Sequence, residues 1–143
     1  MNLPLAQQLV DAETLPWQPL KPGFSMKLLY AAPDIDVRIQ LLRLDPGTVI
    51  ERHRHGGAVH AYNISGKRML LDTHELVGPG GYVYEPPGNV DSWMAVGDEP
   101  VIVLVSVEGS IAYLDDRGEP RATNTTRDIA ENYRRFVAAQ EVR

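Results

Sequence analysis

The chain has 143 residues, of which 43% are hydrophobic and 23% charged, and its net charge is −5 at pH 7. This composition is typical of one globular domain spanning residues 1–143, and the lack of a lysine/arginine run argues against nucleic acid or an anionic membrane as a partner. Cysteine is absent from the sequence, so disulfides and thiolate ligands are excluded and any metal must be held by nitrogen and oxygen.

The first 25 residues are predicted to be loop-like, because four prolines and Gly23 interrupt them. The N-terminus shows no basic region followed by an apolar stretch, so we expect no secretory signal and a cytoplasmic location. No apolar run approaches the roughly 20 residues that a membrane-spanning helix needs, so we expect no membrane partner.

Short runs of β-branched and apolar residues follow, and each ends in residues typical of turns. In chain order, the predicted strands are 26–30, 37–44, 49–55, 59–64, 68–73, 82–85, 91–96, 101–107 and 111–114. Eight or nine short strands without a helical pattern between them predict an all-β fold, an antiparallel sandwich or barrel over about residues 26–115.

The last segment has a different periodicity. Apolar residues recur there at i, i+4, i+7 and i+8, at Ile129, Tyr133, Phe136 and Val137. This spacing predicts a helix over about residues 126–140, with Thr125 and Asp128 resembling a capping box at its start. We expect the helix to pack over one mouth or edge of the barrel.

Three of the four histidines fall within eight residues, at His53, His55 and His60. Alternate residues of a strand share a face, so His53 and His55 are expected to point the same way. If Gly56-Gly57 closes a hairpin, His60 lies opposite this pair and three imidazoles converge on one point. A lone pair of this kind is more often a solvated surface feature, but the third histidine favours a site for Zn, Fe, Ni or Cu.

Two segments resemble the sequence motifs of the cupin superfamily. Gly47-x5-His53-x-His55-x4-His60-x5-Gly66 is similar to the first motif, and Gly80-x5-Pro86-x-Gly88-x2-Asp91 is similar to the second. The resemblance implies a cupin jelly-roll barrel with a C-terminal helix, and one divalent transition metal held by His53, His55, His60 and Asp91.

Two of these positions depart from the usual motif. His60 stands where many cupins have glutamate, and Asp91 stands where nearly all have histidine. A carboxylate at position 91 would complete a set of histidines and one carboxylate, which suits Fe(II). Alternatively, Asp91 accepts a hydrogen bond from a ligand while the histidines alone hold the metal.

Residues 53–62, 82–88 and 17–23 more narrowly resemble the small cupin dioxygenases that include 2,4'-dihydroxyacetophenone dioxygenase; the acetylacetone-cleaving cupins are more distant. This resemblance implies a non-haem Fe(II) enzyme, with zinc or nickel able to occupy the site in a purified sample. Its partners would be O2 and a small diketone or hydroxyketone, in which it splits a carbon–carbon bond next to the carbonyl.

Neighbours of the predicted ligands are candidates for the substrate pocket. Tyr62 and Trp93 each follow a predicted ligand by two residues, and Tyr84 lies just before a proline turn; core packing explains each aromatic equally well. Glu85 is a candidate acceptor for the N–H of a ligand imidazole if it faces inward.

Two other functions remain open. One is a zinc-binding cupin that acts as a ligand sensor or regulatory module, as the C-terminal half of certain anti-sigma factors does. The other is a metal-free isomerase, which would not require clustered histidines. Whichever function holds, we expect a homodimer, because the exposed strands of an open jelly roll must be covered.

Overall fold

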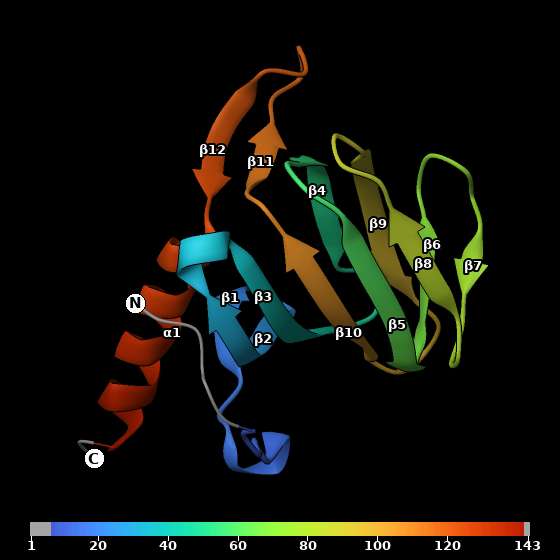
Figure 1. Ribbon diagram of the computed structural model, residues 1–143. Helices are drawn as coiled ribbons and strands as arrows, with labels where there is room; N and C mark the ends of the chain where they lie inside the picture. Colours follow the sequence, from blue (N-terminus) through green and yellow to red (C-terminus); the bar gives the residue numbers. More distant parts are fainter. Residues whose placement is uncertain (1–6, 142–143) are drawn as a thin grey trace.

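The structure is a computed structural model that describes residues 7–141, and it contains two six-stranded antiparallel sheets that face each other (Figure 1). In spatial order, sheet A contains β1 (Gln18–Lys21), β2 (Phe24–Ala32), β3 (Val37–Leu44), β10 (Val101–Glu108), β5 (Val59–Ser65) and β8 (Tyr82–Glu85). Sheet B contains β12 (Pro120–Asn124), β11 (Ile111–Leu114), β4 (Val49–His55), β9 (Val90–Val96), β6 (Lys67–Leu70) and β7 (Leu76–Val77). Short 3-10 helices lie at Ala12–Thr14 and Pro33–Ile35.

Between β3 and β11 the chain passes from one sheet to the other at every connection except the β6–β7 turn. This exchange is the jelly-roll arrangement, and it confirms the predicted all-β fold. Because consecutive strands lie in opposite sheets, residues close in sequence line opposite walls of the interior.

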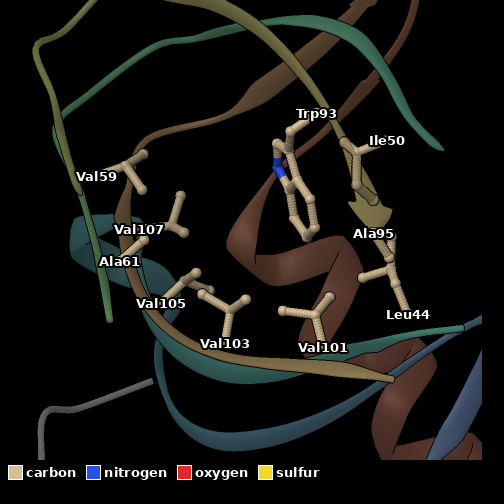
Figure 2. Packing of buried hydrophobic residues seen from close by; sticks show 10 residues of the cluster. All are labelled: Leu44, Ile50, Val59, Ala61, Trp93, Ala95, Val101, Val103, Val105 and Val107. Carbon is tan, nitrogen blue, oxygen red and sulfur yellow. The ribbon is translucent and has the colours of Figure 1, made fainter. Parts of the chain in front are cut away.

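The core lies between the two sheets, where alternate residues of each strand meet (Figure 2). Strand β10 contributes four buried valines, at positions 101, 103, 105 and 107. Trp93 and Ile50 face them from sheet B. As predicted, the apolar residues that recur at every second position of these strands are the ones that face the core.

The sheets extend beyond the range expected from the sequence. Strand β1 and the first residues of β2 occupy part of the predicted loop, and Pro19 is compatible with β1 because β1 is an edge strand. Strand β12 was not predicted, since all its residues are exposed and lack an apolar pattern. It pairs with β11 in a hairpin that projects from the body of the molecule (Figure 1).

Helix α1 (Thr126–Glu141) confirms the predicted C-terminal helix. Its predicted capping box is present: Thr125 N–H donates to Asp128 Oδ2 over 3.0 Å, and Asp128 N–H donates to Thr125 Oγ1 over 3.2 Å. The buried Tyr133 donates its hydroxyl to the Pro16 carbonyl over 2.8 Å, so the helix is tied to the segment that precedes β1. No helix in the described part of the chain is long and apolar enough to cross a membrane.

The β4–β5 connection passes directly beside the β10–β11 connection. Gly56 N–H donates to the Ser110 carbonyl over 2.8 Å, and Glu108 N–H donates to the Ala58 carbonyl over 3.0 Å. A Cβ atom on Gly57 would lie 2.4 Å from the Glu108 carbonyl oxygen. The predicted Gly56-Gly57 hairpin is therefore wrong, because these glycines let two chain crossings between the sheets approach each other.

We predict that Gly57→Ala lowers the free energy of unfolding by about 2 kcal/mol, since the added methyl group must displace backbone. Gly78→Ala is the matched control, because a Cβ atom there meets nothing within 4 Å. Urea unfolding of both variants measures the difference, and equal stabilities would contradict the proposed close approach.

Candidate metal centre

A β-bulge in β4 turns the first histidine inward. Ile50 pairs with Trp93 and His53 pairs with Asp91, so three steps along β4 match two along β9. The extra residue lets both Ile50 and His53 face the interior, and His55 follows in the same phase. His53 is thereby flanked by Asp91 on β9 and by Tyr113 on β11.

The two histidines bring their Nε2 atoms together. Each of the two residues is only 4% exposed, their rings are perpendicular, and the Nε2 atoms are 3.1 Å apart. The Nδ1 atom of His53 lies 2.7 Å from the Glu51 carbonyl oxygen, which belongs to the bulge. A carbonyl only accepts, so Nδ1 carries the proton and His53 Nε2 presents a lone pair toward His55.

Both imidazoles are held neutral. Burial lowers the pKa of His53, and burial together with the nearby His53 and Arg38 lowers the pKa of His55 to about 3. The buried Nδ1 of His55 has no hydrogen-bond partner among the residues that the structure describes. Neutral imidazole is the form that binds a metal. Because His53 Nε2 only accepts, the contact between the two Nε2 atoms places the proton of His55 on Nε2, and a metal bound there would require this proton to move to the unpartnered Nδ1.

A carboxyl group from the opposite sheet lies beside this pair. Glu85 on β8 is buried, with Oε1 3.6 Å from His55 Nε2, and Asn89 Nδ2 donates to Oε1 over 2.8 Å. Burial and the neighbouring Asp91 raise the pKa of Glu85 to about 7, so its carboxyl group titrates near neutral pH. Glu85 therefore faces inward, an orientation that the sequence had left open.

Asp91 is the second buried carboxyl group of the cluster. Burial raises its pKa, while His53 and Arg68 act in the opposite direction. It also shares a side-chain hydrogen bond with Glu85. Two carboxyl groups this close cannot both ionise cheaply unless a cation lies near them.

Arg68 supplies one positive charge at this end of the interior. Its guanidinium lies 4.7 Å from the centre of the Trp93 ring, and its Nε donates to Asn63 Oδ1 over 3.1 Å. Sequence reasoning did not identify Arg68, because a single arginine on a strand is usually solvated.

The cluster opens onto a cavity of about 160 Å³ between the sheets. Its polar lining near the cluster comes from His53, His55, Glu85 and Arg68. Most of the remaining wall is apolar, and it includes Phe24, Met26, Leu42, Ile50, Val59, Ala61, Trp93, Val105, Val107 and Ile111. Trp93, predicted as a pocket residue, is therefore part of the wall. Ile129 and Asn132 of α1 also line the cavity, so the helix covers part of it, as the sequence suggested.

His60 does not join the pair, which corrects the predicted convergence of three imidazoles. Val59 and Ala61 are the buried residues of β5, so His60 between them points outward and is exposed. Its Nδ1 contacts the Tyr82 hydroxyl at 2.5 Å on the outer face of sheet A. The cause is the crossing at Gly57, which carries the chain into the other sheet and fixes the phase of β5.

Two predicted pocket residues share this outward orientation. Tyr62 alternates with the buried residues of β5, and Tyr84 pairs with His60 on the neighbouring β8. Both are exposed, so neither lines the cavity. With Tyr82 they form an outer aromatic face, defined here by His60, Tyr62, Tyr82 and Tyr84.

The histidine pair has the spacing expected of two ligands of one ion. Two imidazole nitrogens about 2.0–2.1 Å from an ion and at a right angle to each other lie about 2.9 Å apart, close to the observed 3.1 Å. Within residues 7–141, however, no three histidine, aspartate or glutamate side chains are already placed to hold an ion. The pair fits a divalent transition metal, and a carboxyl group of Glu85 or Asp91 must turn toward it to complete the site.

Comparison with known proteins identifies the family. The model of the ChrR cupin-like domain matches residues 5–110. The chain belongs to the ChrR cupin-like domain family. Membership places it in the cupin superfamily, in agreement with its fold and its two motifs. A search of curated proteins found no significant match.

Solved structures show the same cupin fold. An RmlC-like cupin protein from Ralstonia eutropha JMP134 has a TM-score of 0.87 and 24% identity, over 94% of this chain and 88% of that one. An acetylacetone dioxygenase from Acinetobacter johnsonii has a TM-score of 0.82 and 15% identity, over 93% and 95%. A chain of the complex between Rhodobacter sphaeroides SigE and the anti-sigma ChrR has a TM-score of 0.59 and 17% identity, over 68% and 51%.

The raised pKa of Glu85 predicts a specific dependence of this cupin's stability on pH. A carboxyl group whose pKa is raised by folding stabilises the protein below its ordinary pKa, and this contribution is lost as pH rises toward 7. Relative to wild type, Glu85→Gln in chelator-treated protein should therefore gain stability between about pH 4.5 and 7, by on the order of 3 kcal/mol.

Chemical unfolding at several pH values measures this difference, and Glu75→Gln, at an exposed site, is the control. A stability difference between Glu85→Gln and wild type that stays constant across this pH range would contradict the burial of an ionisable carboxyl group beside Asp91.

Proposed function

We propose that this cupin is a metal-dependent enzyme of the dioxygenase-like type, which cleaves a carbon–carbon bond in a small diketone or hydroxyketone with O2. The observation that supports it most is the buried pair of neutral imidazoles, with Nε2 atoms 3.1 Å apart, on the wall of a mainly apolar cavity. A purely structural pair would not need a cavity beside it.

The proposed ligands are His53 and His55 through Nε2, together with a carboxylate. Asp91 keeps its predicted role as a ligand in this proposal, and Glu85 is the alternative because its Oε1 is 3.6 Å from His55 Nε2. Two histidines and one carboxylate are typical of non-haem Fe(II) oxygenases, so we propose Fe(II) in function and accept zinc or nickel in purified samples. The ion would supply Lewis-acid and one-electron redox chemistry toward a carbonyl compound and O2.

The chain's own residues give this site three properties. The Glu51 carbonyl fixes the tautomer of His53, so its Nε2 lone pair is available without rearrangement. Glu85, with a pKa of about 7, can hold or release a proton at its carboxyl group near neutral pH. Trp93, Val105 and the other apolar wall residues exclude water from the ligand.

We predict that His53→Ala and His55→Ala each remove the metal, whereas His60→Ala keeps it. The first two variants delete one of two facing nitrogens, while His60 lies on the outer aromatic face. Asp91→Asn should weaken binding by tenfold or more if Asp91 is a ligand.

Elemental analysis and competition with a chelator measure these effects. Near one metal ion per chain is expected in wild type and in His60→Ala. Loss of metal from His60→Ala, or its retention by His53→Ala, would contradict the assignment.

A second candidate function is that of a metal-binding sensor or regulatory module. It is favoured by the match to the ChrR cupin-like domain and by the structural likeness to the complex that contains the anti-sigma ChrR. In that case the cavity would bind a signal molecule without turnover, and the metal would hold the cavity wall together.

Oxygen uptake separates the two functions. With Fe(II) loaded anaerobically, the enzyme should consume about one O2 per molecule of 2,4-pentanedione or 2-hydroxyacetophenone, if either is close to the true substrate. His60→Ala should behave like wild type and His53→Ala should be inactive. Stoichiometric metal binding without O2 uptake over a broad panel of diketones and hydroxyketones would favour the sensor.

Assembly and location stay proposals. We propose a homodimer, supported by the outer aromatic face and by the edge strand β8 that carries part of it. The cytoplasmic location expected from the sequence likewise remains a prediction.

A further inference from the structure

Gln40 lies on the cavity wall that faces the histidine pair. It is on β3 of sheet A, whereas His53 and His55 are on β4 of sheet B. Its side chain is only 6% exposed and lines the same cavity. Its cross-strand neighbour on β10 is Val105, which is apolar and also lines the cavity. Gln40 is therefore a polar group set in a mostly apolar wall.

A buried arginine fixes the orientation of this amide. Arg38 Nε donates to Gln40 Oε1 over 3.1 Å. A guanidinium has donors only, so the oxygen of Gln40 must face Arg38 and the nitrogen must face away from it. The amide nitrogen lies 3.0 Å from the Met26 sulfur. The usual ambiguity between the two ends of a glutamine amide is thus removed by the chemistry of its neighbour.

Arg38 is itself held firmly. Its side chain is 0% exposed, and its Nη1 donates to the Gly109 carbonyl over 3.0 Å and to Thr126 Oγ1 over 2.9 Å. These bonds tie the guanidinium to the β10–β11 connection and to the start of α1. The amide of Gln40 is therefore anchored and cannot turn its oxygen into the cavity without breaking the bond to Arg38.

The donor end of Gln40 is poorly satisfied. A thioether is a weak acceptor, and an amide nitrogen carries two N–H groups. Among the residues that the structure describes, Met26 is the only acceptor for either of them. A buried donor without a good acceptor is costly, whereas an oxygen brought by a ligand would satisfy it.

We propose that Gln40 is a specificity-determining residue that donates a hydrogen bond to a carbonyl oxygen of the ligand, on the wall opposite the histidine pair. This inference rests on the proposed function and narrows its substrate class. The ligand is a small ketone that carries a further carbonyl oxygen beyond the oxygens directed at the metal. The positive charge of Arg38 behind the amide polarises it and strengthens the preference for an electron-rich oxygen.

Two probes of equal length test the assignment. 2,4,6-Heptanetrione and 2,4-heptanedione share the same carbon chain and the same 1,3-diketone, and they differ by one carbonyl group in place of a methylene. Affinities are measured by calorimetry on Zn(II)-loaded protein, so no turnover is required. Wild type should bind the trione on the order of tenfold more tightly than the dione.

Two substitutions separate ligand binding from a structural role. Gln40→Glu keeps an acceptor for Arg38 but loses the donor, and Gln40→Leu loses both. Both variants should bind the two probes with nearly equal affinity. Arg43→Gln, on the same strand but paired with Asp45 outside the cavity, is the control and should keep the wild-type ratio.

The ratio of the affinities for the trione and the dione is also measured by NMR on metal-free protein. In that experiment, addition of the trione should shift the side-chain NH2 signals of Gln40. Failure of metal binding would then refute the proposed metal site and leave the test of Gln40 intact. Equal affinities in wild type, an unchanged preference in Gln40→Glu, or binding of neither probe would overturn the inference.

Discussion

Two imidazoles and two carboxyl groups are buried between sheets whose facing side chains are mostly apolar, and the local structure is arranged to satisfy them. The bulge in β4 offers the Glu51 carbonyl to His53, while Asn89 donates to Glu85. The positive charge of Arg68 lies near both carboxyl groups. Within this cluster, the Nδ1 atom of His55 has no hydrogen-bond partner among residues 7–141. A cation between the imidazoles and the carboxyl groups would offset the remaining cost of burial.

A second set of buried polar side chains, Arg38 and Gln40, lies beside the cavity, and its hydrogen bonds have a different role from those of the histidines and carboxyl groups. Arg38 and Gln40 lie two residues apart on the inner face of β3. The Arg38 side chain donates hydrogen bonds both to the β10–β11 connection and to the first turn of α1. The same contacts therefore hold the C-terminal helix against the barrel and fix an amide donor in the cavity wall. This double role gives a physical reason for burying a guanidinium that makes no ion pair within residues 7–141.

Much of the fold could be predicted because strand alternation and turn residues are local properties. For this reason, the alternating valines of β10 and the periodic apolar residues of α1 were enough to predict which face of each element packs against the rest of the protein. The orientation of His60 could not be predicted in this way, because Gly56-Gly57 is compatible both with a hairpin and with a crossing between sheets. The bulge before His53 and the inward orientation of Gln40 depend on pairing with distant strands, so single-strand patterns carry no signal for them. The shared face of His53 and His55, and the inward position of Trp93 two residues after Asp91, could be predicted from alternation along one strand, whereas the sequence left the orientation of Glu85 open.

The central claim is that His53 and His55, without His60, form the metal centre of this cupin. Anomalous diffraction from crystals of the zinc-loaded protein tests it directly. The claim predicts a single strong peak within bonding distance of Nε2 of both His53 and His55, with a carboxylate of Asp91 or Glu85 as a further ligand. A peak at His60 on the outer aromatic face, or no peak between the two buried imidazoles, would contradict it.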